Sequence, residues 1–293
     1  MKKIIIQLLA LFWTIAVFGQ TDAIKKDSVK VTFEYKQEIK NGKQTPKNWV
    51  ISQKVKDMND NLLREYFFND STHQLDSYVW YFYKNSQLNT KECYFSSDSL
   101  KCLTKFTYDN FGNKTEEAVF RNAGNSIVEY QKNIYNYSDG KKLSCKQYNK
   151  DNKVKASARY YYNLQGKLIK EMYKFKSRSG SKLKSEIITY DYKDDRVSQK
   201  IDQKKFRNGD EKEIYGNYTY NELGQLIELK ETDKNSKPLD QMKYKYYPHG
   251  NLNIFWEYDG EGKLIKLLSY KYEIHTITPG TFKSYLDKLQ KNN

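Results

Sequence analysis

The stretch Tyr220-Asn221-Glu222-Leu223-Gly224-Gln225-Leu226 is one copy of a phrase that recurs along the chain. The phrase consists of a tyrosine, three variable residues, a glycine, one more variable residue and an apolar residue. A phrase that returns at regular spacing is the signature of a repeat architecture. The other copies, the first of them degenerate, pair Tyr108 with Gly112, Tyr162 with Gly166, Tyr246 with Gly250 and Tyr258 with Gly262.

Each position of the phrase suits a tight turn between two antiparallel strands. Glycine adopts positive φ at no steric cost, and this conformation closes a three- or four-residue hairpin loop that contains a bulge. Asn152 stands at the glycine position of a weaker copy, and asparagine tolerates the same conformation. We expect the tyrosine ring to end its strand packed inward with the hydroxyl near the wet rim, and the apolar residue to begin the next strand on the core face.

Weaker turn signals fill the intervals between the copies. The predicted turns are roughly 14 residues apart, which leaves about ten residues of strand and a short polar loop each time. This spacing predicts hairpin after hairpin. The turns fall near residues 112, 124, 140, 152, 166, 180, 195, 209, 224, 235, 250 and 262.

Residues between the turns alternate as strands require. Tyr244 and Tyr246 fall on one face, whereas Lys243 and Lys245 fall on the other. The alternation predicts a sheet with one aromatic and aliphatic face and one cationic and polar face. Beyond the next turn, the residues expected together on the apolar face are Leu252, Ile254, Trp256 and Tyr258.

The phrase resembles the tyrosine–aspartate repeats of the RHS family over roughly residues 105 to 275, with a degenerate extension back to about residue 29. The aspartate after the tyrosine is kept at Asp109, Asp191 and Asp259 but is replaced by Asn163 and Asn221 elsewhere. The resemblance implies a winding β-sheet, which in that family often forms a shell around a toxic C-terminal domain. This chain has no residues left for such a toxin, so the toxin-delivery role is not carried over.

The two ends of the repeat region differ from its middle. Residues 29 to 39 read as the first strand, which turns at Asn41-Gly42. Residues 278 to 293 read as a short helix and polar tail that follow Pro279-Gly280 and cover the sheet edge. Residues 29 to 277 are then one repeat domain with an all-β fold, an antiparallel meander of roughly 18 strands in an elongated, spiralling or rolled sheet. The apolar positions of the helix are Phe282, Tyr285, Leu286 and Leu289.

The first residues predict export from the cytoplasm. Lys2 and Lys3 precede a mostly apolar, uncharged stretch from Ile4 to Phe18, and Gly19 provides a small residue before the cleavage point. Residues 1 to 19 are therefore interpreted as a signal peptide of the type found in Bacteroidota, and residues 20 to 28 as a flexible mature N-terminus. No second apolar run is long enough for a membrane-spanning helix. The expected location is periplasmic, outer-surface-associated or secreted.

The composition excludes several classes of protein. The chain of 293 residues carries 27 Tyr, 14 Phe and 4 Trp, which is too aromatic for a disordered protein, and 30% charged residues, which is too many for an integral helical membrane protein. Its net charge of +15 attracts polyanions such as acidic polysaccharide, anionic lipid or nucleic acid. Export disfavours nucleic acid.

The chain has only three cysteines and three histidines, which limits the disulfides and metal sites that it can form. A two-residue turn at Ser97-Asp98 would place Cys93 opposite Cys102, which predicts a cross-strand disulfide that leaves Cys145 single. The sequence contains no zinc-binding spacing, no nucleophile elbow and no phosphate-binding loop, so we expect no metal and no cofactor.

These observations favour an exported, non-enzymatic protein of the cell envelope that serves as a scaffold or binding surface. Tyrosines interleaved with lysines suit an acidic glycan or a protein partner. The alternative is a glycan-active hydrolase that uses two carboxylates brought together on the sheet surface. A third possibility, an outer-membrane barrel, is disfavoured because Lys243, Lys245 and Lys271 occupy the face opposite the predicted core.

Overall fold

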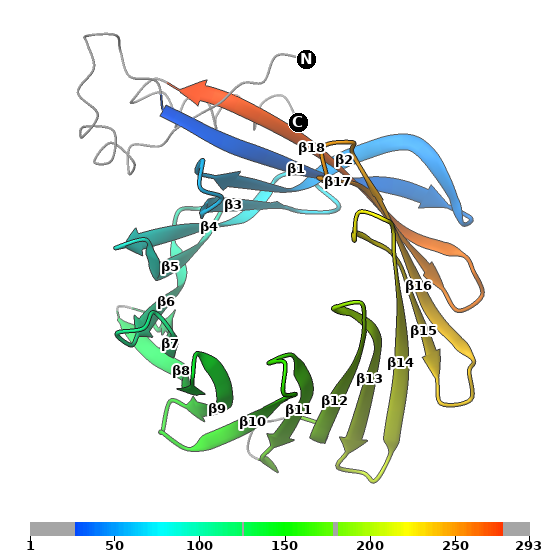
Figure 1. The fold of residues 1–293 in the computed structure, drawn as a ribbon. Helices are drawn as coiled ribbons and strands as arrows, with labels where there is room; N and C mark the ends of the chain where they lie inside the picture. Colours follow the sequence, from blue (N-terminus) through cyan, green and yellow to red (C-terminus); the bar gives the residue numbers. More distant parts are fainter. Residues whose placement is uncertain (1–26, 125, 178–180, 278–293) are drawn as a thin grey trace.

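The computed structural model describes residues 27–124, 126–177 and 181–277, and within them the chain is an all-β protein (Figure 1). The predicted signal peptide, residues 20 to 26 of the predicted flexible N-terminus and the predicted C-terminal helix lie outside the described residues, whereas Asp27 and Ser28 already belong to the first strand. The strands are β1 (Asp27–Lys40), β2 (Lys43–Lys56), β3 (Leu62–Phe68), β4 (Leu75–Lys84), β5 (Gln87–Phe95), β6 (Leu100–Tyr108), β7 (Lys114–Asn122), β8 (Ile127–Ser138), β9 (Lys141–Asn149), β10 (Val154–Tyr162), β11 (Leu168–Phe175), β12 (Leu183–Lys193), β13 (Arg196–Phe206), β14 (Glu211–Tyr220), β15 (Leu226–Asp233), β16 (Pro238–Tyr246), β17 (Leu252–Asp259) and β18 (Leu264–Ile277).

Each strand pairs antiparallel with the strand before it and the strand after it, and the turns between β7 and β18 fall at the positions that the repeat spacing predicts. The described residues thus form the antiparallel meander expected from the sequence. Its 18 strands make a single sheet.

The sheet closes on itself, which corrects the prediction of an elongated, spiralling or rolled sheet. β1 pairs with β18 over a ladder that runs from Asp27 opposite Ile277 to Lys36 opposite Leu268, and β1 also pairs with β2. Figure 1 shows the resulting ring. Closure is favoured because it satisfies the backbone donors and acceptors that two free sheet edges would leave unpaired. A barrel of eight strands has room only for its own side chains, so a ring of 18 strands encloses a wider interior.

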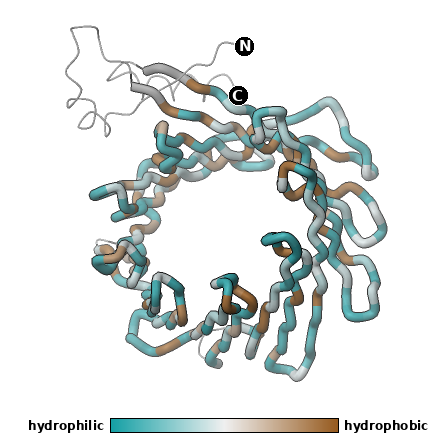
Figure 2. Tube along the Cα trace, viewed as in Figure 1, coloured by the Kyte–Doolittle hydropathy of each residue, from teal (hydrophilic) through white to brown (hydrophobic). Residues whose placement is uncertain are grey.

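Bulges at the turns decide which residues share a face. Between β16 and β17 the register shifts by one residue at Lys245 and Tyr246, so Lys245 lies opposite Ile254 and Lys243 opposite Trp256. A one-residue shift moves every later side chain to the other face. The prediction that Ile254 and Trp256 share the apolar face with the tyrosines is therefore wrong, and both faces mix aromatic, aliphatic and charged residues. Figure 2 shows hydrophilic and hydrophobic residues alternating around the ring.

We call the face that carries Tyr162, Tyr220 and Tyr246 the tyrosine face, and it lines the inside of the barrel. In β10 the side chains of Ala158 and Tyr162 are buried or half-buried, whereas Arg159 between them is exposed, and β14 and β16 repeat this alternation. Side chains on the concave side of a closed sheet converge and shield one another from water. The less exposed face of these strands is therefore the inner one.

The largest buried apolar cluster lies where the barrel closes. Val29, Val31 and Phe33 of β1 pack with Val55 of β2 and Tyr66 of β3, and all five are at most 5% exposed. These residues occupy the face opposite the tyrosine face, so in β1 the outer face is the more buried one, in contrast to β10, β14 and β16. Among the described residues, no helix has the length and apolar character to cross a membrane.

Candidate binding site on the tyrosine face

The strand-end tyrosines connect consecutive hairpins at one rim of the barrel. Each hydroxyl donates a hydrogen bond to a backbone carbonyl at the start of the preceding strand, beyond the last paired residue of the ladder, as at Leu88 and Lys142. The repeated tyrosine therefore satisfies a carbonyl that the ladder leaves unpaired. The six bonds are Tyr83 to Leu62 (3.0 Å), Tyr108 to Leu88 (2.8 Å), Tyr162 to Lys142 (2.9 Å), Tyr192 to Leu168 (2.7 Å), Tyr220 to Val197 (3.0 Å) and Tyr246 to Leu226 (2.9 Å).

Tyr258 departs from the other tyrosines of the phrase. It lies opposite Leu264 and, together with Gln241, on the outer face, with the ammonium group of Lys243 5.4 Å from its ring centroid. The turn that follows Tyr258 lies at the opposite rim of the barrel, and there the tyrosine of the phrase points outward. The expectation that this ring packs inward is therefore wrong.

The turns have the conformation that the phrase suggests. Gly112, Gly166 and Gly224 have φ values of 83°, 80° and 77°. Asp109 accepts hydrogen bonds from the backbone amides of Phe111 and Asn113, at 2.9 and 2.8 Å, through one carboxylate oxygen. The residue after the tyrosine thus organises the loop backbone, and Asn163 accepts the equivalent hydrogen bond from the Lys167 amide at 2.9 Å. Gly250 and Gly262 have φ values of 93° and 79°.

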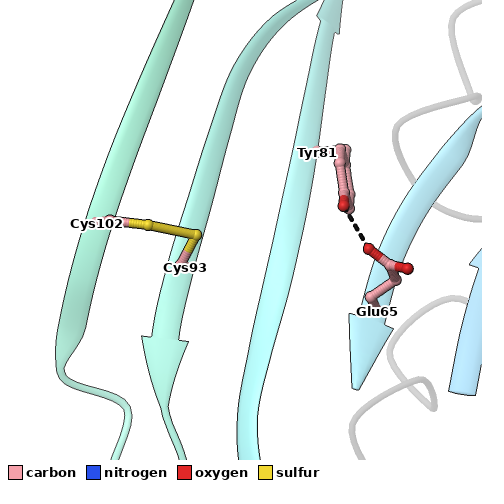
Figure 3. Close-up of a disulfide and its surroundings, with 4 residues drawn as sticks. All are labelled: Glu65, Tyr81, Cys93 and Cys102. Carbon is pink, nitrogen blue, oxygen red and sulfur yellow. Dashed lines mark hydrogen bonds between the residues drawn. A yellow bond between two sulfur atoms is a disulfide. The ribbon is translucent and has the colours of Figure 1, made fainter. Parts of the chain in front are cut away.

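A disulfide joins Cys93 and Cys102, which lie opposite each other in β5 and β6 (Figure 3). The turn between them differs from the predicted two-residue turn, because Asp98 has a φ of 62° and the Phe95 amide bonds the Ser99 carbonyl. A bulge next to Cys93 then shifts the register by one residue and brings the two cysteines together. Cys145 is a free, half-buried thiol whose pKa is raised by burial.

Carboxylates on the tyrosine face accept hydrogen bonds from tyrosines. Glu171 accepts from Tyr190 at 2.6 Å and from Tyr173, and Glu117 accepts from Tyr135 at 3.1 Å. Burial and the neighbouring carboxylate raise the pKa of Tyr190 above its ordinary value. Glu65 and Tyr81 form the same contact at 2.5 Å, on the side of the sheet that carries the disulfide (Figure 3). These tyrosines are fixed, neutral donors.

Glu186 and Asp202 form a carboxylate pair with one property of a glycan hydrolase, a raised pKa on one of its two members. Burial and the adjacent Asp202 raise the pKa of Glu186, and Lys204 lies 3.3 Å from Glu186 and 2.8 Å from Asp202. The two carboxyl groups contact each other directly, whereas a glycosidase holds its pair about 5 to 9.5 Å apart. This pair therefore lacks hydrolase geometry. In the part of the chain that the structure describes, no group of three or more acidic, histidine or cysteine side chains could hold a metal ion.

A pocket of about 200 Å³ opens on the tyrosine face where the barrel closes. Its side chains come from three neighbouring strands, and the register places Glu34 of β1 between Ser52 of β2 and Tyr270 of β18. Glu34 accepts hydrogen bonds from Ser52 at 2.7 Å and from Tyr270 at 3.0 Å. We call this site the seam pocket, and it is lined by Thr32, Glu34, Ser52, Lys54, Lys56, Tyr270 and Tyr272.

The residues of the seam pocket come from both ends of the chain, so no local pattern in the sequence predicts this site. Tyr270 and Tyr272 flank Lys271 in the sequence, and Thr32 and Glu34 alternate with Val31 and Phe33, so each pair is expected to share one face of its strand. This alternation is the sequence signal that groups the pocket residues within each strand. Only the closing ladder joins the two sets.

The fold and site together define a wide, closed antiparallel barrel with a hydroxyl-rich and charged inner face. No family model and no curated protein matches the chain. Similar solved structures include porin-like proteins from Bacteroides uniformis (13% identity, TM-score 0.40) and Bacteroides vulgatus (11%, 0.38), each matched over 83% of this chain and 97% of the other. A DUF1329 family protein from Desulfovibrio piger matches over 88% of both chains with 6% identity and a TM-score of 0.23.

Proposed function

We propose that this protein is an exported, non-enzymatic barrel of the cell envelope whose tyrosine face binds an acidic glycan. The observation that carries the proposal is the lining of that face, where fixed tyrosine hydroxyls, carboxylates and lysines are held by the closed sheet. Sugars are recognised by such a combination, because hydroxyl groups both donate and accept hydrogen bonds and aromatic rings pack against sugar faces. The net charge of +15 favours an acidic polymer over a neutral one.

The proposed location rests on three features of the chain. The leader at residues 1 to 19 directs export. The disulfide between Cys93 and Cys102 suits an oxidising compartment. The outer face carries Lys243 beside Trp256 and Lys271 beside Phe33, and such charges oppose contact with lipid chains. We therefore place the barrel in water, in the periplasm or outside the cell.

The test is binding of the purified mature protein to polygalacturonate, measured by calorimetry at low and at physiological salt. We expect binding that weakens several-fold as salt rises, because screening reduces the attraction between lysines and carboxylates. Pullulan, a neutral polymer, serves as the control and should bind more weakly. Equal binding of both polymers, or binding of neither, would contradict the proposal. Release of reducing ends from polygalacturonate would instead support the hydrolase alternative.

A further inference from the structure

The lysines in and beside the seam pocket differ in their ion pairs. Lys54 pairs with Glu65 at 3.4 Å, and Lys30, the neighbour of Lys56 across β1 and β2, pairs with Asp60 at 3.0 Å. Among the described residues, Lys56 has no acidic partner. The carboxylate that lines the pocket, Glu34, accepts hydrogen bonds from Ser52 and Tyr270 and forms no ion pair with Lys56, so an anionic ligand can pair with the ammonium group of Lys56.

The same pocket also contains a carboxylate and several hydroxyl groups that can form hydrogen bonds with a ligand. Glu34 is held in place by Ser52 and Tyr270, so it is a preorganised acceptor for ligand hydroxyl groups. Thr32 lies beside Glu34 on the same face and directly opposite both Tyr272 and Lys54. The required ligand therefore combines one negative charge with several hydroxyl groups.

The size of the pocket limits the ligand to about one ring. Sites for drug-sized molecules have volumes of about 300 to 1,000 Å³, whereas the seam pocket measures about 200 Å³. A single sugar residue fits this smaller volume, and the rest of a polymer would continue along the tyrosine face.

We propose that the seam pocket binds one uronic acid residue of an acidic glycan. Its carboxylate pairs with Lys56, and its hydroxyl groups bond Glu34, Thr32 and Tyr272. This assignment rests on the proposed function and makes it specific, because it names both the subsite and the chemistry of the sugar.

The test measures binding of trigalacturonate to the mature protein and to its variants by calorimetry. Lys56→Gln removes the charge from a half-buried side chain, and loss of one charge-assisted contact should weaken binding about tenfold or more. Glu34→Gln should also weaken binding, because an amide replaces one of the two carboxylate acceptors. Lys146→Gln, which removes an exposed lysine on the outer face of β9, is the matched control and should bind within about twofold of the natural protein.

The outcomes separate the two proposals. If the natural protein binds trigalacturonate and Lys56→Gln binds it equally well, the pocket assignment is wrong and the proposed function stands. If the natural protein binds polygalacturonate but not trigalacturonate, the single-residue subsite is also wrong. If it binds neither, both proposals fail. A thermal unfolding profile of Lys56→Gln that matches the natural protein shows that lost binding does not come from lost folding.

Discussion

At the scale of single residues, the repeated tyrosine has a structural role that its spacing alone does not reveal. Its ring lies on the inner face, and its hydroxyl satisfies a carbonyl of the neighbouring strand, as Tyr162 does for Lys142. The bond joins one hairpin to the next. The repeated tyrosine therefore has a structural role, which is to hold neighbouring strands of the ring together. The residues proposed to bind a ligand, such as Glu34 and Lys56, stand outside the repeated phrase.

The first prediction concerns this hydroxyl. Tyr162→Phe should lower the free energy of unfolding by about 1 kcal/mol, because it leaves the Lys142 carbonyl without its donor. The measurement is urea denaturation followed by circular dichroism. The neighbouring Tyr161, which is 40% exposed on the outer face, provides the control, and Tyr161→Phe should change stability by less than about 0.5 kcal/mol. Equal effects of the two variants would contradict the role assigned to Tyr162.

A second prediction uses the pKa of Glu231. Burial and the directly opposite Asp240 raise this pKa above the ordinary value of 4.5, so the folded state binds the proton more tightly than the unfolded state. The ionised carboxylate therefore destabilises the fold at neutral pH, and this cost disappears as pH falls through the raised pKa. Glu231→Gln should increase stability at pH 7.5, and its advantage should vanish below about pH 4.

Urea denaturation at several pH values measures the effect of Glu231→Gln. The control is Glu222→Gln, at an exposed position in the loop between β14 and β15, which should change stability little at any pH. A Glu231→Gln variant that is less stable than the natural protein at pH 7.5 would show that the carboxylate is not a source of repulsion.

At the scale of elements, the hairpin and its bulge determine where side chains lie. The bulge next to Cys93 brings Cys102 opposite it, and the bulge at Tyr246 places Trp256 on the outer face. The periodicity of a strand predicts alternation correctly within that strand. It does not predict how the faces of two strands correspond, because one extra residue in the turn reverses them.

The third prediction concerns the hairpin of β5 and β6. Replacing Cys93 and Cys102 together by alanine should lower the free energy of unfolding by roughly 2–3 kcal/mol, because the cross-link restricts a short loop of the unfolded chain. Thermal and urea unfolding measure the loss, and Cys145→Ala is the control with an expected smaller effect. Mass spectrometry after alkylation under native conditions should find only Cys145 modified. Alkylation at Cys93 would show that the disulfide does not form.

At the scale of the whole molecule, the barrel concentrates its buried apolar residues on one side. The strands that close the ring, β1, β2 and β18, have 14 residues each and carry Val29, Val31 and Val55 at no more than 1% exposure. On the other side, β9, β10 and β11 have 8 or 9 residues each, and Ala158 is their only buried apolar residue among those described. The ring is therefore held most firmly where it closes.

The fourth prediction follows from this asymmetry. In hydrogen exchange measured by mass spectrometry, amides of β1, β2 and β18 should exchange most slowly, and those of β9 to β11 should exchange faster. Val31→Ala should accelerate exchange across the closing strands before it affects β10, because it opens a cavity in the main apolar cluster. Uniform protection around the ring would mean that stability does not follow the buried cluster. Fastest exchange in β1 and β18 would mean that the barrel opens at its closing ladder.

The sequence by itself determined the all-β class, the positions of the turns and the alternation within each strand. These features are local, since a glycine at positive φ, a side-chain period of two and an aspartate at a loop start depend on neighbours in the chain. Only the tertiary structure decided that the sheet closes, which face lies inside and that Glu34 and Tyr270 meet in one pocket. Those outcomes depend on pairing between residues more than 230 positions apart and on bulges that add up around the ring, and no local pattern encodes either.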